Sequence, residues 1–235
     1  MRRTLSLFTA GLLALLLAGC GAADRSDGNS GTVSAPSANT EATQSSSPAD
    51  SGGSGSPSAS ASASAPALSA EEQSLAAAAD EVIGALRDRD LARLASWTDS
   101  AHGLRFSPYP HMNDTDRVFQ ADRFPSFKDD GALEWGSYDG SGEPIKLSFR
   151  DYFEKFVYDE DFADATAVSI AKLASSGNMT YNGEELYPGS SFVEYYFPGF
   201  DKKLEGHDWE SLILTFVPNG TDWRLVAVTH GQWTI

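Results

Sequence analysis

The chain has 235 residues and is acidic: 33 Asp and Glu against 17 Lys and Arg give a formal net charge of −16 at pH 7. A surface of that sign repels phosphate backbones, so we expect no nucleic-acid partner. The single cysteine, Cys20, excludes an intrachain disulfide and a zinc site built from cysteines.

The first twenty residues have the layout of an export signal. Two arginines precede an apolar stretch over 5–17, which is too short to span a hydrocarbon core of roughly 30 Å comfortably as a helix. The stretch ends in Leu-Ala-Gly-Cys at 17–20, which resembles the lipobox of bacterial lipoproteins. That resemblance implies removal of 1–19, acylation of Cys20 and a lipid-anchored protein on the extracytoplasmic face of the cell membrane. The alternative is an ordinary secretory signal with a chance cysteine.

Residues 20–67 are expected to form a lipidated, disordered linker. Over 21–67, Ser, Ala, Gly and Pro make up 35 of 47 residues, too few apolar side chains to offset the entropy of ordering. We therefore expect a flexible spacer with an r.m.s. span of about 35–40 Å. Removal of the signal leaves 15 positive and 33 negative side chains. Anionic headgroups repel such a chain, so its membrane partner is reached through the lipid anchor.

Residues 68–235 contain every Trp and Tyr of the chain and are expected to fold as one domain. Apolar side chains at helical spacing predict three helices, over 70–87, 91–97 and 148–157. The first helix begins with a capping box formed by Ser69 and Glu72.

Aromatic and β-branched residues predict strands, mostly in the C-terminal third. The expected strands are 103–106, 133–138, 167–173, 192–197, 211–217 and 223–230. The last two form a hairpin around a turn at 218–220, and 107–131 is expected to be a long loop. Helices first and strands mostly last indicate an α+β fold with helices packed on an antiparallel sheet.

Two segments carry a resemblance to a known superfamily. Residues 85–94 resemble the opening helix–turn–helix of NTF2-like (SnoaL-like, cystatin-like) domains, and 222–230 resemble their closing strand. The resemblance implies a sheet curled into a half-cone with a pocket on its concave side, and a homodimer formed through the sheets. Residues 135–143 and 231–235 also resemble segments of uncharacterised bacterial lipoproteins, a likeness that implies no activity.

Two titratable residues are weak candidates for catalysis. Glu194 lies in a predicted strand and shares a face with the aromatic residues Phe192 and Tyr196, a setting that raises the pKa of a carboxylic acid. His230 ends the last strand, on the face of Val228 and Val226, where some NTF2-like enzymes pair a histidine with an acid. The alternatives are a solvated rim carboxylate and a structural imidazole.

Aromatic side chains near loops and strand ends are candidates for ligand binding. These are Tyr109, Trp135, Tyr138, Tyr196 and Trp233, and Trp209 is a further candidate of the same kind. Flat rings stack on sugars and peptides, although such residues also serve to fill a core.

Other chemistries have little support. Acidic side chains gather at 114 and 116, at 129 and 130, and over 159–161, but none matches an EF-hand loop, and we interpret them as solvated turns. No histidine pair has the HxH or HxxxH spacing, and no Gly-x-Ser-x-Gly motif occurs. We expect no metal and no cofactor.

Three functional hypotheses remain. The leading one is a non-catalytic lipoprotein whose NTF2-like domain binds an unknown ligand or envelope protein. The second is a pocket enzyme, an isomerase, dehydratase or hydrolase, that uses Glu194 and His230 as acid and base. The third is a module that binds cell-wall polysaccharide through its exposed aromatic residues.

Overall fold

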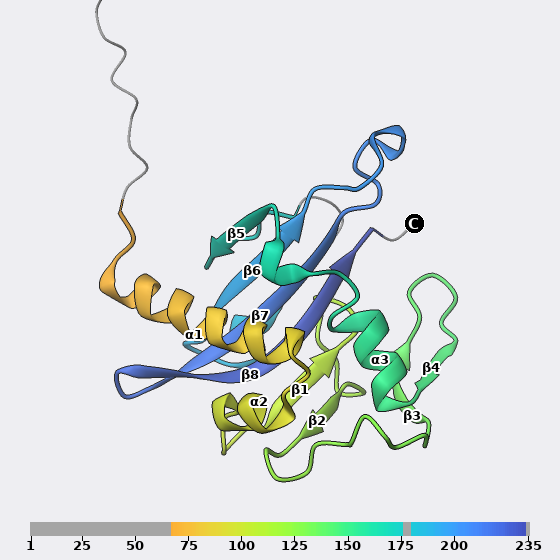
Figure 1. Cartoon of the computed structure of the whole chain (residues 1–235), viewed down its shortest axis with the longest axis horizontal. Coiled ribbons are helices and arrows are strands. Elements are labelled where there is room, and N and C mark those ends of the chain that lie inside the picture. The colour runs from red at the N-terminus through yellow and green to blue at the C-terminus, as the bar shows by residue number, and fades with distance from the viewer. Residues whose placement is uncertain (1–66, 176–179, 234–235) are drawn as a thin grey trace, which may run out of the picture. The chain divides into compact units, whose positions relative to one another are not determined.

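The computed structural model describes residues 67–175 and 180–233 (Figure 1). The predicted signal peptide, Cys20 and nearly all of the predicted linker lie outside these residues. In the part of the chain that is described, no helix is long and apolar enough to cross a membrane.

All three predicted helices are confirmed. Helix α1 spans Ala70–Arg87 and begins with the expected capping box, in which the Ser69 hydroxyl accepts from the Glu72 N–H and the Glu72 carboxylate accepts from the Ser69 N–H. Helix α2 spans Leu91–Trp97 and helix α3 spans Phe149–Phe156. The short elements were not predicted: the helix α4 (Gly183–Leu186) and the 3-10 turns η1 (Phe162–Asp164) and η2 (Lys202–Leu204).

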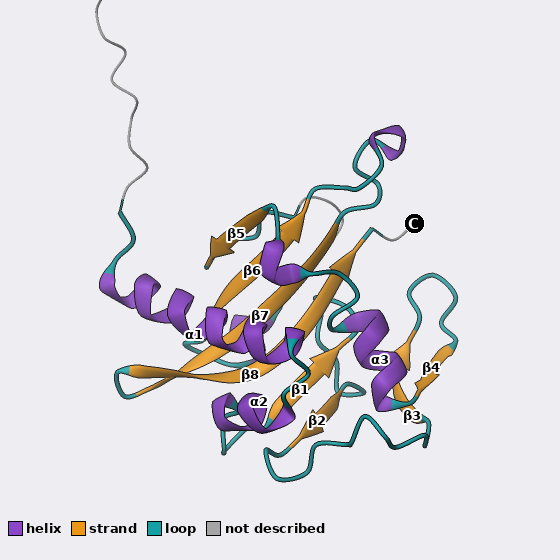
Figure 2. Cartoon of the chain, viewed as in Figure 1, coloured by secondary structure: helices purple, strands orange, loops and turns teal. Residues whose placement is uncertain are grey.

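Six strands form one sheet in the order β2-β1-β8-β7-β6-β5. Their bounds are β1 Leu104–Ser107, β2 Arg117–Phe119, β5 Ala167–Ile170, β6 Ser191–Phe197, β7 Glu210–Asn219 and β8 Asp222–Gln232. Neighbouring strands are antiparallel except β1 and β8, which run parallel, so the expectation of a purely antiparallel sheet is wrong in this one pair. The chain nevertheless forms the predicted α+β fold, with helices packed on a curved sheet (Figure 2).

A separate hairpin lies beside α3 (Figure 1). It consists of β3 (Leu133–Ser137) and β4 (Pro144–Leu147). Strands β4 and β2 were not predicted, and β2 interrupts the predicted loop over 107–131. Both are strands of three or four residues, and their side chains are mostly not buried, so they lack the regular apolar alternation that predicts a strand.

The hairpin of β7 and β8 is confirmed, with a shorter turn than expected. Strand β7 continues through Pro218 to Asn219, and the turn consists of Gly220 and Thr221. Gly220 has a φ of +67°, a left-handed conformation that glycine adopts without a steric penalty.

The two faces of the sheet have different coverings. The face that carries Leu212, Leu214 and Val228, here called the helix face, belongs to a core cluster shared with α1 and α3. The opposite face, here called the loop face, carries Ala227 and packs against Met112 and two tyrosines, Tyr181 and Tyr187. A β-bulge after Thr215 shifts the register. It places Val226 with the loop-face cluster, so the expectation that Val226 shares a face with His230 is wrong.

Stacked aromatic rings fill the core between α3 and the β3–β4 hairpin. The Trp135 ring lies 3.8 Å from the Tyr152 ring at an interplanar angle of 12°, and Phe106 meets both edge-on. Trp135 is completely buried, and its Nε1–H donates to the Leu147 carbonyl at 2.9 Å. The prediction that Trp135 is a ligand-binding residue is therefore wrong, because no face of its ring reaches solvent.

The buried indole gives a stability prediction. Replacement of Trp135 by Ala removes a filled core position and is expected to lower the free energy of unfolding by about 3–5 kcal/mol. Trp233→Ala is the matched control because Trp233 is 37% exposed, and it is expected to change stability by less than about 1 kcal/mol. Urea unfolding followed by circular dichroism measures both variants. Equal losses in the two variants would contradict the assignment of Trp135 to the core.

Candidate functional site

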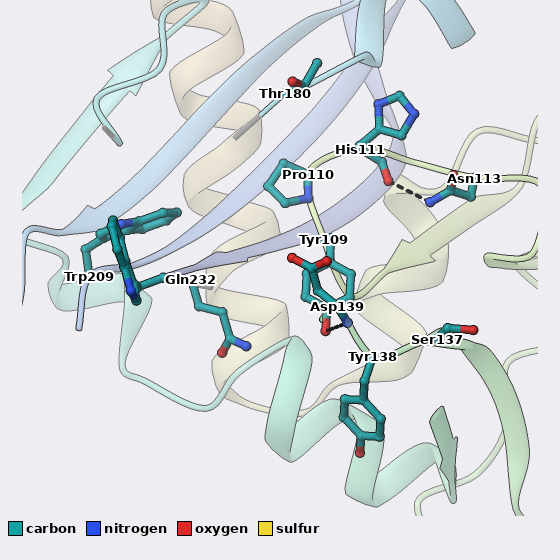
Figure 3. A pocket seen from close by; sticks show the side chains of 11 residues that line it. Tyr109, Pro110, His111, Asn113, Ser137, Tyr138, Asp139, Thr180, Trp209 and Gln232 are labelled. Atoms are coloured by element: carbon teal, nitrogen blue, oxygen red, sulfur yellow. Dashed lines mark hydrogen bonds between the residues drawn. The ribbon is translucent and has the colours of Figure 1, made fainter. Parts of the chain in front are cut away.

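An open cleft of about 390 Å³ lies at the end of the sheet where β7 begins and β8 ends (Figure 3). Its walls come from the loop after β1, the turn after β3, Thr180 and the ends of the central hairpin. The lining residues are Tyr109, Pro110, His111, Asn113, Ser137, Tyr138, Asp139, Thr180, Trp209, Gln232 and Trp233. Segments far apart in the sequence thus meet in one concave surface, as is usual for ligand sites.

Tyr109 joins two of these walls. Its carbonyl accepts a hydrogen bond from the Ser107 hydroxyl at 2.7 Å, which fixes the start of the loop after β1. Its own hydroxyl accepts from the Asp139 N–H at 2.9 Å and so holds the turn after β3 (Figure 3). Burial raises the pKa of the Tyr109 hydroxyl, which therefore remains protonated and neutral at physiological pH.

A buried carboxylate supports the other end of the same loop. Asp116 accepts from the Asn113 N–H at 2.7 Å and lies 3.9 Å from the Arg105 guanidinium, which itself donates to the Asn113 carbonyl. Burial raises the pKa of Asp116, and the hydrogen bond from Asn113 opposes that shift. The interpretation of Asp116 as part of a solvated turn is therefore wrong, because its side chain is almost fully buried and orders the cleft wall.

The cleft combines aromatic rings with neutral hydrogen-bonding groups. Among the described residues that line it there is no Lys or Arg, and the only carboxylate is Asp139. The Trp233 ring stands edge-on to the His207 ring, with 4.3 Å between the ring centroids. The backbone N–H of Trp233 donates to the backbone carbonyl of Trp209 at 3.2 Å. Trp209 is buried, and its indole Nε1–H has no acceptor among the described residues. The described lining thus offers an anionic ligand no permanently positive side chain, and His111 is its only basic group.

Four of the six aromatic residues singled out from the sequence meet in this cleft: Tyr109, Tyr138, Trp209 and Trp233. Trp135 is in the core, as described above. Tyr196 lies on β6 with its ring 6.2 Å from the Trp209 ring and does not line the cleft.

Glu194 and His230 do not meet. The register pairs Glu194 with Ile213, and it pairs His230 with Leu212, the next residue along β7. Because successive side chains of a strand point to opposite faces, the sheet separates the carboxylate from the imidazole. The expected acid–base pair of Glu194 and His230 is therefore wrong.

Glu194 has a structural environment on the loop face. It is fully buried, and its carboxylate accepts backbone N–H groups from Ala174 and Ser175, with the Ser169 hydroxyl at 3.5 Å. These contacts hold the segment after β5 against β6. The expected rim carboxylate is thus also absent.

His230 belongs to a different cluster, on the helix face. Its Nε2 lies 3.0 Å from the Asp159 carboxylate, and Glu210 completes a group whose ligand atoms all lie within 4.8 Å of one another. His230 is fully buried, while the Asp159 side chain is 19% exposed. The prediction that Asp159 lies in a solvated turn is therefore wrong, and Glu210 was not predicted as a site residue. The register of β7 against β8 was the missing signal, because it places Glu210 two residues from the partner of His230.

Burial and the neighbouring Asp159 carboxylate raise the pKa of Glu210 from its ordinary value of 4.5 to about 7, and His230 opposes the shift. One imidazole and two carboxylates also form a donor set that suits a divalent cation. This cluster and the cleft are neighbours, since Glu210 pairs across the hairpin with Gln232, which lines the cleft.

Comparisons with known proteins add little to this geometry. No protein-family model matches the sequence, and no curated protein matches it. One solved structure similar to this chain is a designed NTF2-like protein whose title begins Rd1NTF2_05. The match has 11% sequence identity and a TM-score of 0.24, and it covers 64% of this chain and 90% of the other. At that TM-score the likeness supports no argument about the fold or the function of this chain.

The raised pKa of Glu210 predicts a specific pH dependence of stability. Glu210 holds a proton up to about pH 7 in the folded chain and only up to about 4.5 when unfolded, so folding takes up a proton between these values. The contribution of Glu210 to the free energy of unfolding is therefore fully present below pH 4.5 and is lost as the pH rises through 7. The expected loss is about 1–2 kcal/mol after allowance for solvent screening.

Glu210→Gln is neutral at every pH and is expected to remove this part of the pH dependence. Urea unfolding at pH 5 and pH 8 in the presence of EDTA, for the variant and the parent, measures the difference. Glu143→Gln replaces an exposed carboxylate and serves as the control. An unchanged difference between the two pH values in Glu210→Gln would contradict the prediction.

Proposed function

We propose that this chain is an extracytoplasmic lipoprotein, anchored to the membrane through an acylated Cys20, whose folded part binds a neutral glycan without chemical conversion. The proposal combines the lipobox-like residues 17–20 with the composition of the cleft. The cleft is the observation on which the binding role depends. The spacer over 21–67 would hold it away from the acidic membrane surface.

We further propose that the fold is NTF2-like. Two N-terminal helices precede the first strand, and α1 lies across one face of a curved sheet (Figure 1). The segment that resembles the closing strand of that superfamily is β8, in the middle of the sheet. The cleft differs from the pocket implied by the resemblance, because it opens at the end of the central strands and is bordered by the β3–β4 turn.

The chemistry of the lining favours a sugar. A sugar ring has apolar C–H faces that stack on aromatic side chains and a rim of hydroxyls that need donors and acceptors. Tyr109, Tyr138 and Trp233 supply rings, while the side chains of Asn113 and Gln232 supply amide donors and acceptors. Among the described lining residues no Lys or Arg supplies a permanent positive charge for a phosphate or a carboxylate, and His111 is the only basic side chain.

The positions of Glu194 and His230 exclude an enzyme that uses these two residues as acid and base. The two groups lie on opposite faces of the sheet and cannot contact one ligand. General acid–base catalysis requires both groups within hydrogen-bond reach of the reacting atoms.

The anchor predicts a result in living cells. A bacterial host that expresses the full chain is expected to incorporate an alkyne-labelled fatty acid into it, and the chain should sediment with membranes. Cys20→Ala removes the only thiol and is expected to lose both the label and the sedimentation. Ser6→Ala, within the apolar stretch, is the control that keeps both. Labelling that persists in Cys20→Ala would show that acylation occurs elsewhere.

The cleft predicts binding of a neutral oligosaccharide. Isothermal titration with tetra-N-acetylchitotetraose, which is uncharged, and a pull-down on isolated cell-wall glycan are the measurements. Trp233→Ala is expected to weaken binding about tenfold, because one stacked ring contributes on the order of 1 kcal/mol beyond its area. Phe200→Ala removes an aromatic side chain that is 51% exposed and does not line the cleft, so it is expected to leave affinity unchanged.

Two outcomes would contradict the proposal that the cleft binds a glycan. One is that the chain is not retained on cell-wall glycan and gives no heat of binding with tetra-N-acetylchitotetraose. The other is that Trp233→Ala and Phe200→Ala weaken the affinity equally. Circular dichroism and gel filtration check that each variant keeps the fold and the oligomeric state of the parent chain.

A further inference from the structure

Three side chains from separate parts of the chain converge on the helix face near the end of the sheet. His230 comes from β8, Glu210 from β7, and Asp159 from the segment between α3 and η1. One imidazole nitrogen and two carboxylate oxygens lie within 4.8 Å of one another. Rigid neighbouring strands hold two of the three groups, so their separation is fixed by the register of the hairpin.

One carboxylate oxygen of Asp159 and one of Glu210 are not satisfied by hydrogen bonds from the described residues, while Asp159 Oδ2 contacts His230 Nε2. Asp159 Oδ1 and Glu210 Oε2 are both buried and have no donor among the described residues. Buried oxygens of this kind normally have a partner, because an unmatched buried acceptor costs free energy. The cluster thus has two buried oxygen atoms that are free to coordinate a cation.

Its charge is also unbalanced. In the described ranges, no Lys or Arg forms an ion pair with Asp159 or Glu210, and His230 is the only group of cationic type that faces them. Glu160 and Asp208 are also close enough to act on Glu210 and add negative charge. A cation among these carboxylates would relieve their mutual repulsion.

We propose that Asp159, Glu210 and His230 bind a divalent transition-metal ion of the zinc class. Imidazole and carboxylate together suit Zn²⁺, whereas Ca²⁺ and Mg²⁺ prefer oxygen ligands alone. The ion replaces the contact between His230 Nε2 and Asp159 as the link between the two residues. Three protein ligands leave a fourth position for water or for a ligand atom.

The competing explanation is a plain hydrogen bond. In that case the His230–Asp159 contact serves only to attach the segment after α3 to β8, with Phe156 and Phe162 edge-on to the imidazole. Only the metal site requires Glu210, because the hydrogen bond joins His230 to Asp159 without it. The metal site stands independently of the proposed glycan, since neither Asp159 nor Glu210 lines the cleft.

The test is isothermal titration of the full chain with Zn²⁺, without an affinity tag and in detergent. The chain carries Cys20→Ala so that its only thiol cannot compete for the ion. One Zn²⁺ per chain is expected to bind with a Kd of roughly 1 μM or tighter, and Ca²⁺ is expected not to bind. The isosteric variants Glu210→Gln and Asp159→Asn are each expected to weaken Zn²⁺ binding at least about tenfold.

A second measurement separates a metal site from a fold defect. Co²⁺ titrated in place of Zn²⁺ is expected to give visible d–d absorption in the parent chain and to lose it in Glu210→Gln. His102→Gln is the matched control, because His102 Nδ1 lies 2.8 Å from Asp99 in an exposed pair without the Glu210 counterpart. This variant is expected to bind Zn²⁺ and Co²⁺ as the parent does.

The proposal is overturned if no Zn²⁺ binds more tightly than about 100 μM. Binding that is unchanged in Glu210→Gln and Asp159→Asn, or lost in His102→Gln, overturns it equally. Circular dichroism spectra that match the parent are required of each variant. A variant that fails this check is replaced by His230→Asn, which removes the imidazole ligand while it keeps a polar side chain.

Discussion

The register of the hairpin formed by β7 and β8 is the constraint on which both sites depend. It pairs Leu212 with His230 and Glu210 with Gln232, so the imidazole and the Glu210 carboxylate point to the helix face at neighbouring positions. A shift of one residue would turn every side chain of one strand to the opposite face. Both strands are buried on both faces over most of their length, so such a shift would exchange the side chains that pack on the two faces and disrupt the core.

The cleft depends on a second set of contacts, made by loops. Tyr109 connects the segment after β1 to the turn after β3 through its hydroxyl, and Asp116 with Arg105 fixes the segment at Asn113. The aromatic stack of Trp135 on Tyr152 holds the β3–β4 hairpin against α3. A surface formed by loops is thereby ordered by a buried carboxylate and a buried indole, which is how a rigid scaffold usually positions a binding site.

Charge separates the two sites chemically. The chain is strongly acidic, yet the described lining of the cleft contains a single carboxylate and no Lys or Arg, which favours a neutral ligand. The cluster at Asp159, by contrast, concentrates two carboxylates beside one imidazole, which favours a cation. A glycan-binding cleft and a metal site on neighbouring residues of one sheet are thus compatible. Among the described residues the two proposed sites share no side chain.

The amino-acid sequence determined the local structure. The capping box of Ser69 and Glu72 and the helical spacing of apolar residues predicted α1, α2 and α3, and alternation with a glycine turn predicted the final hairpin. The sequence also indicated the four Tyr and Trp residues that line the cleft. Only the tertiary structure decided which groups meet. Long-range register places Glu194 and His230 on opposite faces of the sheet, and Asp159 beside His230 across 71 residues of chain. Local sequence patterns report which face a residue takes within its own strand, but the pairing of distant segments depends on how the whole core packs.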